Sequence, residues 1–304
     1  PLKHTIAKYR WLYQLGLQGP DMFFYNIPIL RHRDYRNVGS YMHEHKVNAF
    51  FECCLRRIGT IRSRQQQEEA ISYLAGFMNH YIADSICHPY VYGRIGYPVD
   101  APTSMHHGMH AHLENELDAI LLWKYKKKKP SEFNQTATIC LNGQEIQFIS
   151  HFLASCINET YYPITYRNNF QVTPAMVHRS IWALRFGCRT LSDKTGKKKF
   201  GIAQVESIFV NHPVASAKMV TDSVTDYRSS CNLNHEAWSN PWDPTRVSTA
   251  SFVDLFHETL DKCSRVYELL NSAVTDNVPL DKQDLSPLLT ELGNESYHSG
   301  LPVD

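Results

Sequence analysis

Two histidine and carboxylate pairs with a spacing of four residues are the side chains best suited to chemistry. His80 and Asp84 form the first pair, and His110 and Glu114 form the second, with His88 between them. Residues four apart lie on one helix face with Cβ atoms about 5–6 Å apart, close enough to bind one metal ion. Zinc takes imidazole nitrogen and carboxylate oxygen, and catalytic zinc sites commonly have three protein ligands plus water. The spacing therefore predicts zinc, with His88, His110 and Glu114 as one ligand set.

A further pair, His112 and Glu116, has the same spacing on the same expected helix. Positions two apart are about 200° apart around a helix, so His110 and His112 cannot face the same ion. We expect the His112 pair to face solvent. One such pair alone is more typical of an exposed ion pair than of a metal site. Two pairs within 35 residues, with His88 between them, favour metal binding.

The elements that must position these residues have the periodicity of helices. Apolar residues at spacings of three and four predict helices over 6–17, 43–58, 66–85, 106–123, 149–160, 174–191, 202–230 and 251–275. Pro89 is expected to end the third helix, which places His88 in a turn. Asn142-Gly143 predicts a small β-hairpin within 131–148. Strands do not alternate with helices, which argues against a doubly wound α/β fold.

These patterns predict an all-α fold. We expect one multi-helical domain over 1–275, with an insertion around 126–148 that holds the hairpin. The polar segment 276–304 is expected to form a weakly ordered tail.

Composition is that of an ordinary soluble globular protein of 304 residues, with a formal charge of +1 from 31 basic and 30 acidic residues. Sixteen histidines exceed what a core needs and suit metal binding. Eight cysteines without a C-x-x-C pair suggest reduced thiols and a cytoplasmic protein, although a leader removed before Pro1 would instead indicate secretion. No apolar run approaches the roughly 20 residues of a transmembrane helix.

Five sequence elements occur in an order that resembles the zinc-dependent phospholipase C family over residues 10–125. They are Gly-Pro-Asp21, Gly39-Ser-Tyr-Met-His43, Gly76-Phe-Met-Asn-His80-Tyr-Ile-Ala-Asp84, His88-Pro89 and His110-x-x-x-Glu114-Asn. The related zinc nucleases that are specific for single strands share this architecture. The resemblance therefore implies the multi-helical fold more directly than the substrate.

The resemblance also implies a cluster of up to three zinc ions. Asp21, His43, His80 and Asp84 would surround one ion, and His88, His110 and Glu114 a second. The family's third ion uses the N-terminal residue and an early histidine. Pro1 and His4 do not stand where that histidine is expected, because only 20 residues precede Asp21. We expect two ions, and the third stays open.

The chemistry expected of such a cluster is phosphodiester hydrolysis. Zinc lowers the pKa of a bound water towards about 7, and hydroxide attacks phosphorus in line. The resemblance implies that Asp21 orients or deprotonates this water. We expect a phospholipase C acting on a glycerophospholipid, with transient contact at a membrane surface. The alternatives are a nuclease specific for single strands, with nucleic acid as its partner, and a non-catalytic zinc-binding protein.

An aromatic group beside the expected ligands is a candidate substrate wall. Phe23, Phe24, Tyr25 and Tyr41 would contact a choline-like cation or an acyl-glycerol body. Base stacking in a nuclease would use the same residue types, and aromatic residues near a helical core are more often simply packed. The lysine runs 126–129 and 197–199 are more typical of solvated loops than of contacts to lipid headgroups or nucleic acid.

Overall fold

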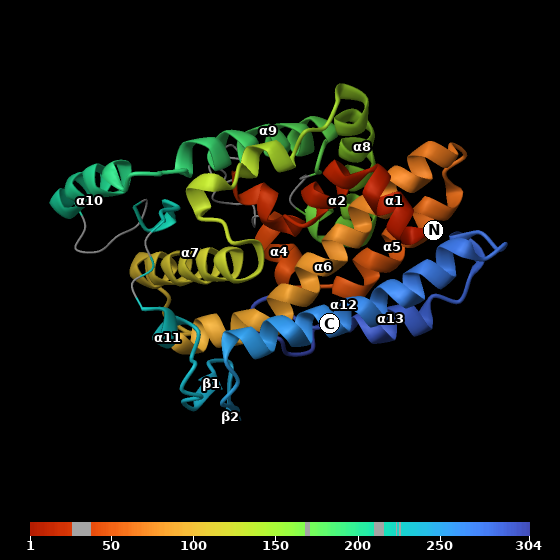
Figure 1. Cartoon of the computed structure of the whole chain (residues 1–304). Coiled ribbons are helices and arrows are strands. Elements are labelled where there is room, and N and C mark those ends of the chain that lie inside the picture. The colour runs from red at the N-terminus through yellow and green to blue at the C-terminus, as the bar shows by residue number, and fades with distance from the viewer. Residues whose placement is uncertain (26–37, 168–170, 210–215, 223, 225) are drawn as a thin grey trace. The chain divides into compact units, whose positions relative to one another are not determined.

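The computed structural model describes residues 1–25, 38–167, 171–209, 216–222, 224 and 226–304. The basic run 31–33 lies outside these residues. In the described part the chain is mainly helical, and its one sheet is a two-stranded antiparallel hairpin (Figure 1). The all-α prediction is confirmed.

The helices and strands have the following bounds. The α-helices are α1 Leu2–Lys8, α2 Arg10–Gly16, α4 Val38–Glu44, α5 Val47–Thr60, α6 Arg64–Arg94, α7 Ser104–Lys126, α8 Gly143–Arg167, α9 Pro174–Leu191, α10 Lys197–Phe209, α11 Tyr227–Ser230, α12 Phe252–Thr275 and α13 Ser286–Leu292. Short 3₁₀ helices are η1 Gly19–Tyr25, η2 Pro130–Glu132, η3 Gln135–Thr138, η4 Ser216–Lys218 and η5 Leu280–Lys282, and the strands are β1 Trp238–Asn240 and β2 Asp243–Ser248.

The longest helix, α6, passes through Pro89 and ends at Arg94. The prediction that Pro89 ends this helix is therefore wrong. Proline removes one backbone donor, but the two residues that follow it, Tyr90 and Val91, are buried, and their packing keeps the chain helical. As a result His80, Asp84 and His88 all belong to one helix.

The hairpin expected at Asn142-Gly143 is also wrong, because these residues begin α8. The backbone N–H of Glu145 donates to Oδ1 of Asn142 at 2.9 Å, and the N–H of Asn142 donates to Oε2 of Glu145 at 2.8 Å. This reciprocal arrangement is a capping box, which satisfies donors at a helix start. Among the described residues, the hairpin is instead β1–β2, around Trp242.

Two expected helices are each divided in the structure. The first is divided at Tyr9 into α1 and α2. The second is divided at Lys46, whose φ of 50° is left-handed, so that His43 lies on the short helix α4 and α5 follows separately. Left-handed residues end a helix, because a continuous right-handed helix cannot include them.

The chain divides into two compact units. Unit 1 comprises Pro1–Ser85, Ala137–Phe186 and Thr259–Asp304, and unit 2 comprises Ile86–Thr136 and Gly187–Glu258. In unit 1, aromatic rings of α5 and α6 form much of the core: Phe77 lies 5.3 Å from Phe50 and 5.8 Å from Phe51 between ring centroids. Each such buried side chain contributes about 1.5–3 kcal/mol.

Unit 2 has its own core on the C-terminal part of α6. Tyr90 and Val91 pack with apolar residues of α7 and α12 and with Cys231 of the intervening segment. The further members of this cluster are Cys87, Leu117, Ile120, Phe252 and Leu255. This core fixes α6 against α7, the two helices that carry His88 and His110.

Glycines allow α2 and α6 to approach closely in unit 1. A Cβ atom on Gly16 would lie 2.1 Å from the carbonyl oxygen of Tyr73, and one on Gly76 would lie 2.1 Å from that of Tyr13. Any side chain at either position would separate the helix backbones. This close packing brings η1, which follows α2, next to the part of α6 that bears His80.

The segment from 276 onward is not a loose tail. Leu288 and Leu292 of α13 are buried at 3% and 0% exposure, and Tyr297 is 1% exposed. The expectation of a weakly ordered tail is wrong, because apolar residues three and four apart give α13 a face that packs. The boundary proposed at residue 275 stays a prediction. Among the described residues, no helix is long and apolar enough to cross a membrane.

Candidate metal centres

The first candidate metal centre lies in unit 1 and joins three elements. Asp21 of η1, His43 of α4 and His80 of α6 each offer one ligand atom, and these atoms all lie within 4.8 Å of one another. Nε2 of His43 lies 3.0 Å from Oδ1 of Asp21. The His43 side chain is 2% exposed, whereas that of Asp21 is 43% exposed. The cluster therefore has a buried nitrogen side and a carboxylate that solvent reaches.

The ring of His43 has a defined orientation. Its Nδ1 lies 2.7 Å from the carbonyl oxygen of Gly39 in the same helix. A carbonyl only accepts, so Nδ1 carries the proton and donates, which leaves the lone pair on Nε2 pointing at Asp21. Two lone-pair atoms at 3.0 Å require either a proton or a cation to be shared between them. A backbone acceptor on the second ring nitrogen is the usual support of a metal-binding histidine.

Gly19 is required where η1 meets His80. A Cβ atom on Gly19 would lie 2.0 Å from Cδ2 of the His80 ring, and the φ of Gly19 is +47°. Both the conformation and the contact exclude larger residues. His80 also approaches Asp84, with 3.1 Å between Nε2 and Oδ2. Asp84 thus contacts a cluster member but is not among the three residues whose ligand atoms are all mutually close.

The second candidate metal centre lies in unit 2. Oε1 of Glu114 is 3.0 Å from Nε2 of His88 and 3.0 Å from Nε2 of His110. Burial alone would raise the pKa of Glu114, but the two imidazoles outweigh it and hold this pKa well below its ordinary value. The site therefore favours an ionised carboxylate between two ring nitrogens.

The residues of both centres fit zinc. Ligands around a tetrahedral zinc ion, at metal distances of about 2.0–2.2 Å, lie about 3.4 Å from one another. The separations of 3.0 Å from Asp21 to His43 and from Glu114 to His110 are near this value. Each centre also combines imidazole nitrogen with carboxylate oxygen, which is a zinc donor set. All seven predicted ligands are thus in the two centres or, for Asp84, in contact with one; their role as ligands stays a prediction.

Two residues near the C-terminus enclose His43, and the sequence did not indicate them. The ring of Tyr297 lies 4.8 Å from that of His43, and the ring of His298 stacks on it at 4.9 Å with an angle of 22°. The backbone N–H of Tyr297 donates to the carbonyl oxygen of His43 at 2.9 Å. Only the folded chain brings residues more than 250 positions apart into contact.

Three aromatic rings adjoin the second centre. Tyr92 lies 4.5 Å from His110 between ring centroids, and it also contacts Tyr97 at 4.6 Å and Trp242 at 4.9 Å. Tyr97 and Trp242 stack at 5.7 Å with an angle of 29°. We name Tyr92, Tyr97 and Trp242 the aromatic cluster. Tyr92 follows His88 by four residues. A prediction that α6 continues past Pro89 would therefore have placed Tyr92 on the same helix face as His88.

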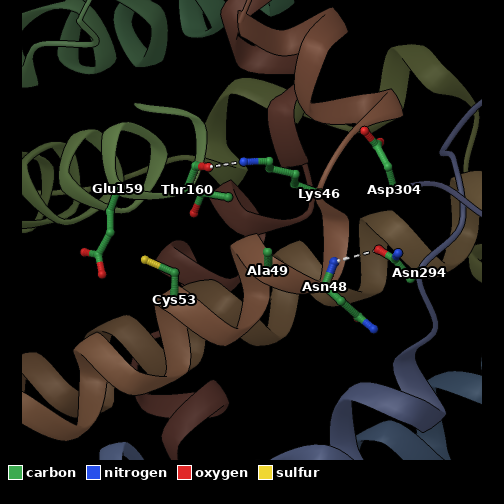
Figure 2. Close-up of a pocket in the computed structure, with 8 residues that line it drawn as sticks. All are labelled: Lys46, Asn48, Ala49, Cys53, Glu159, Thr160, Asn294 and Asp304. Carbon is green, nitrogen blue, oxygen red and sulfur yellow. Dashed lines mark hydrogen bonds between the residues drawn. The ribbon is translucent and has the colours of Figure 1, made fainter. Parts of the chain in front are cut away.

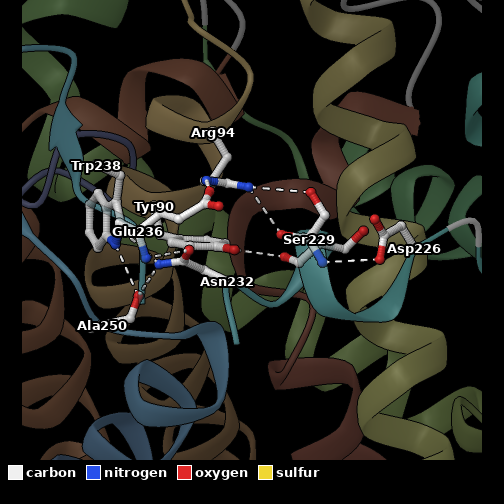
Figure 3. A network of polar contacts seen from close by, with 9 residues as sticks. Tyr90, Arg94, Asp226, Ser229, Asn232, Glu236, Trp238 and Ala250 are labelled. Carbon is white, nitrogen blue, oxygen red and sulfur yellow. Dashed lines mark hydrogen bonds and ion pairs between the residues drawn. The ribbon is translucent and has the colours of Figure 1, made fainter. Parts of the chain in front are cut away.

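Polar contacts hold the hairpin that supplies Trp242, as Figure 3 shows. Arg94, the last residue of α6, donates to the carbonyl oxygen of Ser229 at 3.1 Å and approaches Glu236 at 3.4 Å. Nε1 of Trp238 donates to the carbonyl oxygen of Ala250 at 3.0 Å. The segment before β1 and the base of the hairpin are thereby fixed to unit 2.

The aromatic residues predicted as a substrate wall do not form one group. Phe23 is completely buried, so it belongs to the core and its assignment to the wall is wrong. Phe24 is 37% exposed and lies 5.5 Å from His43 between ring centroids. Tyr41 stacks on His45 at 4.2 Å, and Tyr25 is half-buried at the end of η1. Of the four rings, Phe24 is the one that is both exposed and beside a predicted ligand.

The second pair on α7 does not face solvent as a unit. His112 is 46% exposed, but the side chain of Glu116 is 7% exposed and accepts a hydrogen bond from Oγ of Ser230 at 2.6 Å. The expectation that both residues face solvent is wrong for Glu116. The pair does lie on a different face of α7 from His110, as expected. That face is covered by Ser230 near Glu116, so it is not open to solvent there.

Unit 1 also contains an open cavity of about 400 Å³ (Figure 2). Lys46 donates across it to the carbonyl oxygen of Thr160 at 3.2 Å. The other lining residues are Asn48, Ala49, Cys53, Glu159, Asn294 and Asp304. This cavity shares no lining residue with either metal centre.

Comparison with known proteins agrees with the geometry. The model of the family described as "Zinc dependent phospholipase C" matches residues 1–165, more than half of the 304 residues, and this stretch contains all seven predicted ligands. Neither a curated protein nor a solved structure matches the chain. From the extent of this match, the chain belongs to the zinc-dependent phospholipase C family.

Proposed function

We propose that this protein is a zinc-dependent phosphodiesterase of phospholipase C type, which hydrolyses the bond between glycerol and phosphate in a glycerophospholipid. The observation that carries the proposal is the pair of histidine and carboxylate centres within the stretch that matches the family. Zinc in these centres supplies positive charge that lowers the pKa of water and neutralises phosphate oxygens. The remaining steps are assigned to side chains of the chain itself.

Asp21 is the proposed base. Its side chain is 43% exposed, whereas the nitrogen ligands beside it, His43 and His80, are 2% and 10% exposed. Asp21 is therefore the member of this centre that a water molecule and a phosphate reach from solvent. One oxygen faces His43, and the other accepts the proton of the attacking water. A zinc ion shared between Nε2 of His43 and the facing oxygen of Asp21, which are 3.0 Å apart, would hold the carboxylate in place.

Each centre has aromatic residues that suit the organic part of a lipid. Phe24 lies beside His43, and the aromatic cluster lies beside His110. Aromatic faces attract a quaternary ammonium and also pack on glycerol and acyl groups. A phosphodiester with an apolar or cationic substituent is the substrate class that fits these surroundings.

Paired assays on the zinc-loaded protein test this function. We expect release of phosphocholine from phosphatidylcholine, loss of that activity with a zinc chelator, and its return with added zinc. Single-stranded DNA in the same buffer is the competing substrate. Cleavage of DNA without lipid turnover would replace the proposal by a nuclease, and tight zinc binding without turnover of either would replace it by a non-catalytic zinc protein.

A further inference from the structure

Helix α9 has two apolar faces, of which the core uses one. Val177, Ile181 and Leu184 are 0%, 1% and 0% exposed, and they pack the helix into unit 1. On the opposite face, Trp182 is 64% exposed and Phe186 is 56% exposed. The core therefore packs against one face of α9, and much of the opposite aromatic face stays exposed to solvent.

The two exposed aromatic residues form a continuous surface. Trp182 and Phe186 are four residues apart, and their rings stack with centroids 5.6 Å apart and an angle of 8°. At 64% and 56% exposure, two side chains of about 150–250 Å² each present roughly 200–300 Å² of mostly apolar area to water. This area approaches the lower end of the range for the largest patches on soluble proteins, about 300–600 Å². The largest apolar patches on soluble proteins often bind a partner or a membrane.

The charged residues of helix α9 itself are all basic. Helix α9 contains three arginines and neither aspartate nor glutamate. Arg179 is exposed and precedes Trp182 by three residues, which places it on the same face. Helices with basic residues beside tryptophan and phenylalanine lie in the interface of a bilayer, with the rings at headgroup level and the cations near lipid phosphates.

We propose that the face of α9 formed by Arg179, Trp182 and Phe186 docks the protein on a phospholipid surface that carries negative charge. The choice of lipid over an acidic protein rests on the proposed function, because the substrate of a phospholipase lies in such a surface. The exposed rings bury into the headgroup region, and the arginine attracts the protein to anionic lipid.

Vesicle binding tests this proposal without any turnover. Full-length protein is sedimented with vesicles of phosphatidylcholine, alone or mixed with phosphatidylglycerol. Trp182→Ser with Phe186→Ser should weaken binding at least about ten-fold, because both anchoring rings are lost. Arg179→Gln should weaken binding to the anionic vesicles about five-fold and have little effect on neutral ones. The matched control, Leu260→Ser with Val278→Ser, changes two apolar residues that are each 44% exposed elsewhere in unit 1.

The outcomes separate docking from catalysis. Two results would overturn the proposal directly: undiminished binding of the variant that lacks Trp182 and Phe186, or an equal loss of binding in the control. A wild-type protein that binds neither kind of vesicle would also overturn it and would leave this face to a protein partner. Hydrolysis of a short-chain phosphatidylcholine below its micellar concentration is measured in parallel. We expect this hydrolysis to be unchanged in every variant, because a monomeric substrate requires no docking on a membrane. If the proposed function is wrong, the wild type will not hydrolyse this lipid either.

Discussion

Nε2 of His43 faces Oδ1 of Asp21 at 3.0 Å, and the opposite nitrogen of the same ring donates to the carbonyl oxygen of Gly39. The ring is thereby fixed with its lone pair directed at a carboxylate. An uncharged imidazole and an ionised carboxylate cannot satisfy each other in this orientation without a proton or a cation. The zinc-dependent family to which the chain belongs indicates the cation.

Asp21→Asn should lower zinc affinity at the first centre by at least about a hundred-fold, since even outer partners of zinc ligands contribute ten- to a hundred-fold. Asparagine keeps the shape but removes the negative charge. Competition with a chromophoric chelator measures the change. Asp100→Asn, at an exposed position, is the control; unaltered affinity in Asp21→Asn would exclude Asp21 as a ligand.

His110→Ala and His112→Ala form a matched pair on α7. Nε2 of His110 lies 3.0 Å from Glu114, whereas His112 is two residues further and 46% exposed. We expect His110→Ala to lose one zinc ion per chain and His112→Ala to keep the wild-type content, as measured by elemental analysis. Equal loss in both variants would show that the helix phase assigned to the ligands is wrong.

Glu116→Ala should destabilise the fold without loss of metal. The carboxylate is buried and accepts the hydrogen bond from Ser230, so its removal leaves a hydroxyl without its partner and a cavity. The expected loss in free energy of unfolding is about 1–3 kcal/mol, measured by urea denaturation. Glu258→Ala, at an exposed position, should change this free energy by less than about 0.5 kcal/mol. Loss of zinc from the folded Glu116 variant would contradict a purely structural role.

His298→Ala should weaken zinc binding by loosening His43. The His298 ring stacks on that of His43 and is 23% exposed, so its removal opens little of the core. We expect an affinity loss of about ten-fold, the lower end of the range for residues that support a ligand, with an unchanged thermal midpoint of the metal-free protein. His4→Ala, at an exposed histidine, is the control. An unchanged affinity in His298→Ala would remove the C-terminal segment from the metal centre.

The sequence predicted which histidines and carboxylates lie close together better than it predicted their surroundings. Spacing of four on a helix placed His110 with Glu114, and the order of motifs added Asp21 and His43, because these signals are local. Pro89 misled the prediction, since tertiary packing of α6 outweighs the local preference of proline. Long-range folding, which leaves no periodic signal, brings Tyr297 to His43 and Trp242 to Tyr92, so the sequence did not indicate either residue.

The number of zinc ions per chain tests the central claim most directly. Purified protein is loaded with zinc, passed over a desalting column and analysed for metal and protein, together with His43→Gln and Glu114→Gln. We predict two ions in the wild type and one fewer in each variant, because each substitution removes a ligand from a different centre. A wild-type protein without bound zinc, or variants that keep the full content, would contradict the assignment of both centres.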